Sequence, residues 1–303
     1  MTSETITAAA AGTWKLGDLT VNRLGFGAMR LTQSGGAFGD GTPGDRGRAV
    51  TVLRRAIELG VDHIDTAAFY FSPLRSANEL INRALAPYPD DLVIATKVWP
   101  GRDPSGKWWW ATPEQLRGQV EENLRQLGRD HLDVVNLRIP PGRAAGSIAE
   151  HFGALAELRQ AGLVRHLGLS NATPAHLAEA RSIAPVVCVQ NPYGIGLRPG
   201  ELVGPLACAE QGIAFVPFFA IAGTGREAGA GGADSEEVLA VARAHRATAA
   251  RVRLAWTLGQ GPNVLAIPGT GDPDHLADNV AAGALRLSRE ELARLDAAHR
   301  SGT

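Results

Sequence analysis

The chain of 303 residues has a formal net charge of −1, and 45% of its residues are hydrophobic. A near-neutral balance supplies no basic surface for nucleic acid or for an anionic membrane. No apolar run approaches the roughly 20 residues that a membrane-spanning helix requires. The two cysteines, Cys188 and Cys208, form no CxxC pair, so we expect neither a structural disulfide nor a metal site, and a reducing cytoplasm fits this usage.

The N-terminal segment, residues 1–12, has no basic stretch of the kind that begins a secretory signal, and it contains Glu4. We interpret it as a mobile tail ahead of one domain that spans residues 13–303. The stretch TWKLGDLTV, Thr13–Val21, then predicts a β-hairpin. The hairpin is expected to cover the bottom of that domain.

Eight short apolar segments follow in chain order, and such near-continuous apolar runs are typical of strands buried on both faces of a parallel sheet. They are Leu24–Met29, Val61–Asp65, Asp91–Lys97, Leu132–Leu137, Val164–Ser170, Val186–Asn191, Ile213–Phe218 and Asn263–Gly269. Helical patterns fill the intervals between them. Several of these begin with a capping residue, as at Thr112, Ser147 and Ser288.

The alternation of eight strands with helices predicts an α/β protein built as a closed (β/α)8 TIM barrel, with the hairpin at its bottom. An open doubly wound sheet is the alternative. Such sheets usually carry a GxGxxG fingerprint after the first strand, and GFGAMR at Gly25–Arg30 does not match it. The barrel is therefore the favoured fold.

Polar side chains stand at the ends of the predicted strands, where the chemistry of such barrels is located. In chain order they are Asp65, Tyr70 in the loop that follows, Lys97, Arg138, Ser170, Asn171, Gln190 and Thr270. Because the carboxyl ends of the strands meet at one rim, we expect these side chains to surround one mouth. A structural role explains any one of them easily, and the whole set points to a catalytic site.

Asp65, Tyr70 and Lys97 form the combination with the clearest chemistry. A buried aspartate–lysine pair places positive potential beside a phenol, which stabilises the phenolate and prepares the tyrosine to donate a proton near neutral pH. Tyr70 is therefore a candidate general acid. Two alternatives stay open: Asp65 as a capping or core carboxylate, and Lys97 as the imine-forming nucleophile of a barrel lyase.

One low-complexity stretch, GTGREAGAGGAD at Gly223–Asp234, follows the seventh predicted strand. Loops after barrel strands lie on the functional face. The stretch is therefore either a flexible loop or a lid over a ligand.

Together these residues resemble the aldo-keto reductase superfamily, and the similarity covers nearly the whole chain. HIDTAAFY (His63–Tyr70) resembles the family's segment with the aspartate and the tyrosine, VIATKV (Val93–Val98) its lysine strand, and GLVRHLGLSN (Gly162–Asn171) its nicotinamide-binding segment. A bacterial branch that includes pyridoxal reductases is most similar. The resemblance implies NADPH-dependent reduction of a carbonyl compound to an alcohol.

The resemblance also implies roles for individual residues. Asp65, Tyr70 and Lys97 fill three of four catalytic positions, and the fourth, usually histidine, is Arg138. The positions implied for the cofactor are Ser170, Asn171 and Gln190 at the carboxamide, Phe218 and Phe219 at the nicotinamide ring, and Thr270, His275 and Asn279 at the adenosine phosphate. Amide side chains suit a carboxamide because they both donate and accept hydrogen bonds.

Three departures from the family pattern bear on these roles. Arginine does not release its proton near neutral pH, so we expect electrostatic assistance from Arg138, with a salt bridge of no catalytic role as the alternative. Gly269 and His275 stand where many members carry basic residues, so NADPH is the expected cofactor and NADH stays open. Phe71 replaces a common glycine and is expected to narrow the pocket.

The expected lining of the substrate pocket is Phe71, Trp99, Trp108 and Tyr193. A flat aromatic carbonyl compound would gain from stacking there. Alternatively, the tryptophans only pack their loop onto the barrel. The expected partner is a small carbonyl substrate, with no nucleic acid or membrane, and the oligomeric state is not predicted. A nicotinamide-binding sensor without turnover is the alternative function.

Overall fold

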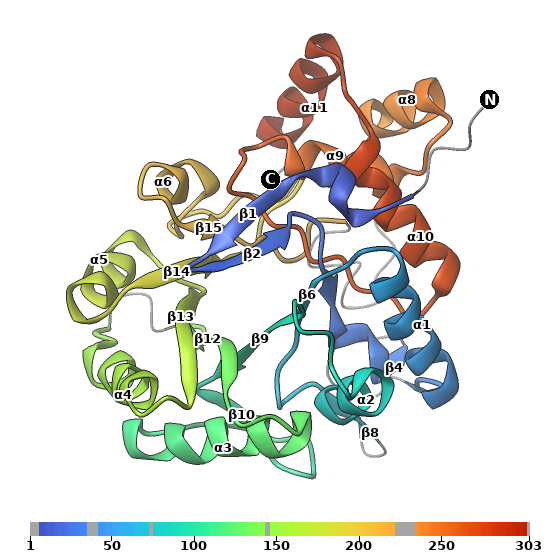
Figure 1. The fold of residues 1–303 in the computed structure, drawn as a ribbon. Coiled ribbons are helices and arrows are strands. Elements are labelled where there is room, and N and C mark those ends of the chain that lie inside the picture. Colours follow the sequence, from blue (N-terminus) through green and yellow to red (C-terminus); the bar gives the residue numbers. More distant parts are fainter. Residues whose placement is uncertain (1–5, 35–41, 73–74, 143–145, 222–233, 302–303) are drawn as a thin grey trace.

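The computed structural model describes residues 6–34, 42–72, 75–142, 146–221 and 234–301. Seven parallel strands form one curled sheet in the order β15-β14-β13-β12-β9-β6-β3 (Figure 1). The strands are β3 (Phe26–Gly27), β6 (His63–Asp65), β9 (Val93–Val98), β12 (Leu132–Arg138), β13 (Val164–Ser170), β14 (Val186–Gln190) and β15 (Ala214–Phe215). Seven of the eight predicted strands therefore occur, in the predicted order.

The ring closes through residues 263–268, which lie between β15 and the start of the first barrel segment. Leu265 N donates to Phe215 O at 2.8 Å, and Gly25 N donates to Ala266 O at 2.9 Å. This segment makes only isolated bridges and not the full strand that we predicted. Pro268 lacks a backbone donor, which limits the ladder on this side. The fold is a closed barrel, and the open-sheet alternative is wrong.

The closure requires glycine at two facing positions, Gly27 and Gly269. A Cβ atom on Gly269 would lie 2.5 Å from the Gly27 carbonyl oxygen, and one on Gly27 would lie 2.6 Å from the Ile267 carbonyl oxygen. Only glycine permits two backbones to approach so closely. The glycine at position 269, one of the departures noted in the sequence analysis, therefore has a packing reason.

Helices surround the sheet on its outer side (Figure 1). They are α1 (Arg46–Glu58), α2 (Ala77–Leu85), α3 (Leu116–Leu127), α4 (Ala149–Gln160), α5 (Pro174–Ile183), α6 (Pro205–Ala209), α8 (Glu236–His245), α9 (Ala249–Leu258), α10 (Pro273–Ala281) and α11 (Arg289–Ser301). The predicted caps at Thr112 and Ser288 make their reciprocal hydrogen bonds with Gln115 and Glu291. Ser147 instead donates to Glu179, and Ile148 occupies the capping position of α4.

The predicted hairpin forms from β1 (Thr13–Leu16) and β2 (Leu19–Asn22). Leu16 and Val21 pack against Val93, Val134 and Leu265 from the barrel interior, at the opposite end from the carboxyl ends of the strands. The hairpin therefore covers the bottom of the barrel, as expected. No long apolar helix that could cross a membrane occurs among the described residues.

The segment before the hairpin is ordered from Thr7 onward. Ala8–Ala11 forms a 3₁₀ turn, η1, that Thr7 caps. Ala8 is fully buried, and its N–H donates to Leu59 O at 2.8 Å. Residues 8–11 of the expected tail are thus packed onto the end of α1, while the mobility of the segment stays a prediction. Residues 1–5 of that expected tail, and residues 223–233 of the expected lid, lie outside the described residues.

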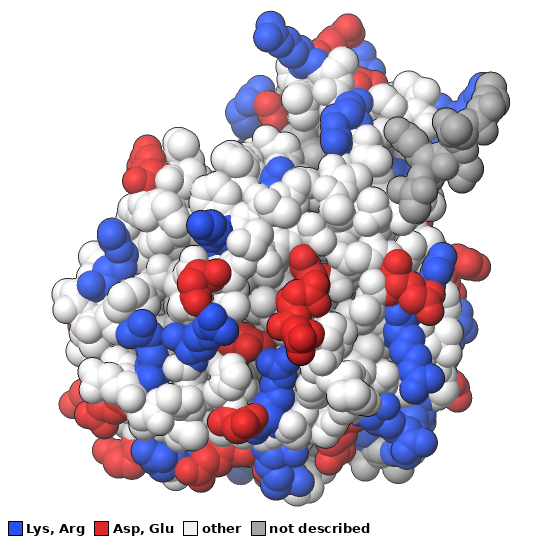
Figure 2. Space-filling model, in the orientation of Figure 1, with Lys and Arg blue, Asp and Glu red and all other residues white. Residues whose placement is uncertain are grey.

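Basic and acidic side chains are mixed on the face of the barrel that carries the hairpin (Figure 2). No basic patch gathers on this face. The mixture agrees with the formal net charge of −1. A nucleic-acid-binding surface would need clustered lysine and arginine.

Candidate active site

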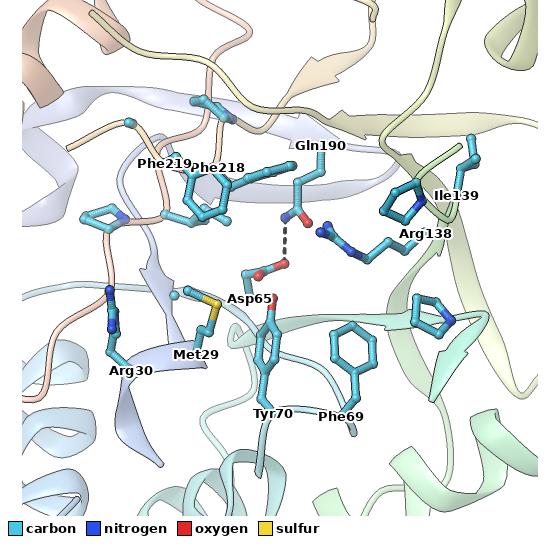
Figure 3. A pocket seen from close by; sticks show the side chains of 18 of the residues that line it. Met29, Arg30, Asp65, Phe69, Tyr70, Arg138, Ile139, Gln190, Phe218 and Phe219 are labelled. Atoms are coloured by element: carbon cyan, nitrogen blue, oxygen red, sulfur yellow. Dashed lines mark hydrogen bonds between the residues drawn. The ribbon is translucent and has the colours of Figure 1, made fainter. Parts of the chain in front are cut away.

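A cavity of about 360 Å³ opens at the carboxyl ends of the strands (Figure 3). We call it the reaction cavity. Its lining is Gly27, Met29, Arg30, Asp65, Phe69, Tyr70, Pro100, Trp108, Trp110, Arg138, Ile139, Pro140, Pro141, Gln190, Pro217, Phe218, Phe219, Ala220, Ile221, Ile267, Pro268 and Gly269. Its size is within the range of small-molecule sites, and a few polar groups converge in a mainly apolar wall.

Asp65 is the centre of a buried polar network at the floor of this cavity. The Lys97 ammonium lies 2.5 Å from Asp65 Oδ1 and 3.0 Å from the Thr66 carbonyl oxygen. Gln190 donates from Nε2 to Asp65 Oδ2 at 2.8 Å. Asp65 pairs with Ala95 in the β6–β9 register, and Lys97, two residues on, shares the face of Ala95. Adjacent strands therefore bring this acid and base together.

Tyr70 lies beside this ion pair, in the loop after β6. Its ring centroid is 4.9 Å from Lys97 Nζ, and its side chain faces the cavity with Asp65 behind the hydroxyl (Figure 3). Phe69 packs its ring edge-to-face against Tyr70 at 5.1 Å. The Tyr70 backbone is held at both ends, by a bond to Ala67 O and a bond from Ala77 N. A phenol is thus fixed next to a buried cation.

Arg138 ends β12 and extends its guanidinium into the same cavity (Figure 3). Its Nη1 donates to Ser170 Oγ at 3.0 Å, and its Cζ lies 5.2 Å from the centre of the Phe218 ring. Burial lowers the pKa of Arg138, while the nearby Tyr70 and Asp65 act in the opposite direction. Arginine remains a cation at neutral pH, so it supplies N–H donors and positive charge but no acid–base step.

The residues predicted at the nicotinamide carboxamide occupy neighbouring strand ends. Gln190 Oε1 is a buried acceptor with no partner among the described residues. Ser170 is fully buried and accepts from Arg138, while Asn171, at φ +58°, donates to Ile139 O. Phe218 and Phe219 both line the cavity. A buried unused amide oxygen beside an aromatic face fits a carboxamide-bearing ring.

A second hollow of about 530 Å³ adjoins the cavity, and we call it the outer hollow. It is lined by Arg30, Leu31, Gln33, Gly44, Asp45, Arg48, Ala49, Gly269, Thr270, Gly271, Asp272 and His275. Arg30 and Gly269 line both spaces, so a long ligand can extend from one into the other. Thr270 and His275 line this hollow, whereas Asn279 is buried within α10 and does not line it.

An ion pair crosses the outer hollow between Arg48 of α1 and Asp272. Asp272 also caps α10 by accepting from the backbone N–H groups of Asp274 and His275. These backbone bonds, with His275 and Arg48 nearby, lower the pKa of the Asp272 carboxyl. The hollow thus combines two arginines, a histidine and a helix N-terminus, a combination that suits an anion.

Three of the four residues expected in the substrate pocket lie elsewhere. Trp99, at φ +94°, turns away and stacks on His151 at 4.0 Å. Phe71 lies under the Arg102 guanidinium at 4.7 Å, outside the reaction cavity. Tyr193 stacks on Trp256 at 5.8 Å. Each side chain has an aromatic or cationic partner away from the cavity, and these three expectations are corrected.

Trp108 lies in the cavity wall as expected, and its neighbours divide between two sides. β10 (Pro100–Arg102) and β11 (Trp108–Trp110) form a hairpin. Trp108 and Trp110 line the cavity, whereas Trp109 packs over Gly101 on the other side. Successive residues of a strand face opposite ways, so two of the three tryptophans face the cavity, where their rings stack on each other with centroids 6.2 Å apart.

Several lining residues escaped the sequence analysis. Met29 ends the first predicted strand, and Arg30 and Ile139 follow predicted strand ends by one and two residues, so the strand-end rule extended into the loops could have found them. Arg48 gave no such signal, because it is on a helix far in sequence from Asp272. Within the described residues, no cluster of three or more His, Cys, Asp or Glu side chains could hold a metal ion.

The comparison with known families decides the identity of this site. The sequence model of the Aldo/keto reductase family matches residues 23–300. The chain belongs to the aldo/keto reductase family. It is therefore an NAD(P)H-dependent oxidoreductase.

The relatives agree with this assignment. The pyridoxine 4-dehydrogenase of Escherichia coli is 47% identical over 95% of this chain and 98% of its own. A crystal structure of an aldo-keto reductase from Klebsiella pneumoniae in complex with NADPH is 27% identical, with a TM-score of 0.74 over 92% of this chain and 91% of its own. A glycerol dehydrogenase from Gluconobacter oxydans, 23% identical, shares the fold with a TM-score of 0.80 over 97% of this chain and 96% of its own.

Proposed function

We propose that this aldo/keto reductase uses NADPH to reduce an aromatic aldehyde of the pyridoxal type to its alcohol. The observation that carries the proposal is Tyr70, fixed beside the buried Lys97–Asp65 pair in a mainly apolar cavity. The name of the Escherichia coli relative, pyridoxine 4-dehydrogenase, supports a substrate of this type.

In this mechanism the carbonyl oxygen lies at the Tyr70 hydroxyl. When bound, the reduced nicotinamide supplies a hydride to the carbonyl carbon. Tyr70 donates its proton to the oxygen, and the Lys97 ammonium stabilises the phenolate that remains. Asp65 holds Lys97 in place, so its charge is fixed before the reaction begins. The products are the alcohol and the oxidised cofactor.

Two groups of residues would hold the cofactor. Gln190 Oε1, with Ser170 and Asn171 on the next strand end, would bind the carboxamide while the Phe218 ring supports the nicotinamide. Thr270, His275 and Arg48 would hold the adenosine phosphate in the outer hollow. The positive charge of Arg48 favours the adenosine phosphate of NADPH. The ion pair with Asp272 offsets part of that charge, so NADH is expected to bind as well, more weakly.

Neither alternative function fits the site as well. An imine-forming lysine must present a free amine to the substrate, whereas the Lys97 Nζ is buried and engaged by Asp65 Oδ1 and the Thr66 carbonyl oxygen. A sensor without turnover would not need the phenol, acid and lysine together. The arrangement therefore favours catalysis over either alternative.

We also place the enzyme in the cytoplasm. Cys188 and Cys208 are free and buried, and burial raises the pKa of each thiol to about 12. Free structural thiols of this kind are typical of a reducing compartment. The small-molecule substrate is expected there as well.

Tyr70→Phe tests the proposed function. This change removes the proton donor and keeps the ring, so kcat for pyridoxal should fall roughly 10²–10⁴-fold. NADPH affinity, followed by quenching of tryptophan fluorescence, should stay the same. Turnover near the wild-type rate would contradict the role of Tyr70. NADPH binding without turnover of any carbonyl compound by the wild-type protein would favour the sensor.

A further inference from the structure

We propose that Arg138 makes this enzyme selective for aromatic aldehydes with an ionised hydroxyl group ortho to the aldehyde. This inference rests on the proposed carbonyl-reductase function and names its substrate class. The pattern is that of a 2-hydroxybenzaldehyde, and pyridoxal, whose aldehyde is flanked by a ring hydroxyl, shares it.

The first support is that, among the described residues, most N–H donors of Arg138 make no hydrogen bond and no carboxylate pairs with its charge. A guanidinium carries five N–H groups. Among the described residues, one of them donates to a protein acceptor, Ser170 Oγ. The nearby carboxylate, Asp65, is already engaged at both oxygens by Lys97 and Gln190. The cation therefore faces the cavity without a carboxylate of its own.

The second support is the low polarity of the wall around this cation. Phe69, Ile139, Pro140 and Phe218 line the same cavity. Burial of a charge without a counter-charge costs free energy, and an anion that binds beside the charge recovers part of that free energy. Burial lowers the pKa of Arg138, which agrees with this loss of solvation. The site is thus prepared for an anionic group on the substrate.

The third support is the shape of the cavity and the position of the proton donor. Trp108 and Trp110 line the cavity and stack on each other, with ring centroids 6.2 Å apart and planes within 13°, and Phe219 adds a third aromatic side chain to a lining that suits an aromatic ring. Tyr70 and Arg138 converge on this space from neighbouring sides (Figure 3). Two oxygens on adjacent ring substituents can therefore meet the phenol and the guanidinium together.

The chemistry explains why this pairing helps the reaction. An ortho phenolate feeds electron density into the aldehyde and makes its carbon a poorer hydride acceptor. An N–H donor from Arg138 to the phenolate withdraws that density and leaves the aldehyde oxygen free to accept from Tyr70. The hydride still enters at the carbonyl carbon, and the proton still comes from Tyr70. The phenolate emerges unchanged in the alcohol product.

The test compares kcat/KM for 2-hydroxybenzaldehyde and 4-hydroxybenzaldehyde at a pH at which both are ionised. Both isomers place the phenolate in conjugation with the aldehyde, and only the ortho isomer can reach Arg138 from the Tyr70 position. A charge-assisted hydrogen bond predicts a preference of roughly 10- to 100-fold for the ortho isomer. In Arg138→Gln both rates are expected to fall and the ratio should approach one. Arg138→Lys, which keeps the charge, should retain part of the preference.

A binding measurement separates recognition from turnover. Because Trp108 and Trp110 line the cavity, 2-hydroxybenzyl alcohol should quench their fluorescence at lower concentration than 4-hydroxybenzyl alcohol at a pH at which both phenols are ionised, and Arg138→Gln should remove the difference. Equal kcat/KM for the two aldehydes, or a preference that survives in Arg138→Gln, would overturn this inference and leave the proposed function standing. Failure to reduce any aldehyde would contradict both.

Discussion

The reaction cavity and the outer hollow each contain an acid–base ion pair, and the two pairs differ sharply in burial. The side chains of Lys97 and Asp65 are 1% and 6% exposed, whereas those of Arg48 and Asp272 are 55% and 30% exposed. Substitution of one partner of a buried pair strongly destabilises the fold, because the other partner is left as an unpaired buried charge. An exposed pair is screened by water and salt and contributes little.

This difference in burial matches the different roles proposed for the two ends of the site. In the proposed mechanism the chemical step needs a fixed charge beside Tyr70, and the buried pair would provide it. Cofactor choice needs only a small bias at the phosphate end, which an exposed arginine can supply. Substitutions at the buried pair should therefore abolish activity and leave the type of reaction unchanged. Single substitutions at the exposed pair should shift the preference between NADPH and NADH.

The largest effect is expected from Lys97→Met. The change leaves Asp65 buried without its cation, so the free energy of unfolding should fall by about 3–5 kcal/mol. Turnover should fall as well, since the charge beside Tyr70 is lost. Urea denaturation and steady-state kinetics measure the two effects.

Two further variants sharpen the interpretation of Lys97→Met. The double variant Asp65→Asn with Lys97→Met removes both charges and should recover most of the stability without recovering activity. Lys15→Met, at an exposed hairpin position, is the matched control and should change stability by less than about 0.5 kcal/mol. Unchanged stability in Lys97→Met would contradict the importance of the buried pair.

A smaller effect is expected from Arg48→Ala in the outer hollow. Removal of a half-exposed cation should weaken NADPH binding by about 1 kcal/mol, roughly fivefold, and leave NADH binding nearly unchanged. The loss should shrink at high salt, because exposed charges are screened. Arg55→Ala is the matched control, since Arg55 is on the same helix and pairs with Glu58. An equal loss for both cofactors would argue against phosphate recognition by Arg48.

The smallest effect is expected from Asp272→Asn, which keeps a capping side chain and removes a negative charge near the proposed phosphate site. NADPH affinity should rise a few-fold. The pKa of Asp272 is lowered from its usual 3.8, so its carboxylate persists in mild acid. Any stability that this charge contributes is present above pH 3.8 and is lost as the pH falls through its folded value. Tighter NADH binding in the variant would contradict this account.

The sequence predicted the parts of the fold that depend on local pattern. Apolar runs located the strands, and the strand-end rule brought Asp65, Lys97, Arg138 and Gln190 to one mouth. The barrel closure was predicted less well, because residues 263–268 pair through a few backbone bonds that depend on the close approach of Gly27 and Gly269. Such an approach is a tertiary property with no local signature.

The tryptophans near the cavity show a second limit of prediction from sequence. Residues 108–110 were treated as one cluster, whereas strand alternation sends Trp109 to the far side of the hairpin. Trp99 is adjacent in sequence to the strand of Lys97, yet its positive φ and its stack on His151 take it out of the cavity. Side-chain direction at a loop depends on backbone angles and partners that sequence alone does not give.

The central claim is that the reaction cavity brings a nicotinamide and a carbonyl carbon together for direct hydride transfer. The most direct test supplies the wild-type protein with pyridoxal and with NADPH that carries deuterium in both positions at C4 of the nicotinamide. Mass spectrometry of the alcohol then shows where the deuterium goes. The account predicts one deuterium on the carbon that was the aldehyde. An alcohol without deuterium, or no alcohol at all, would contradict it.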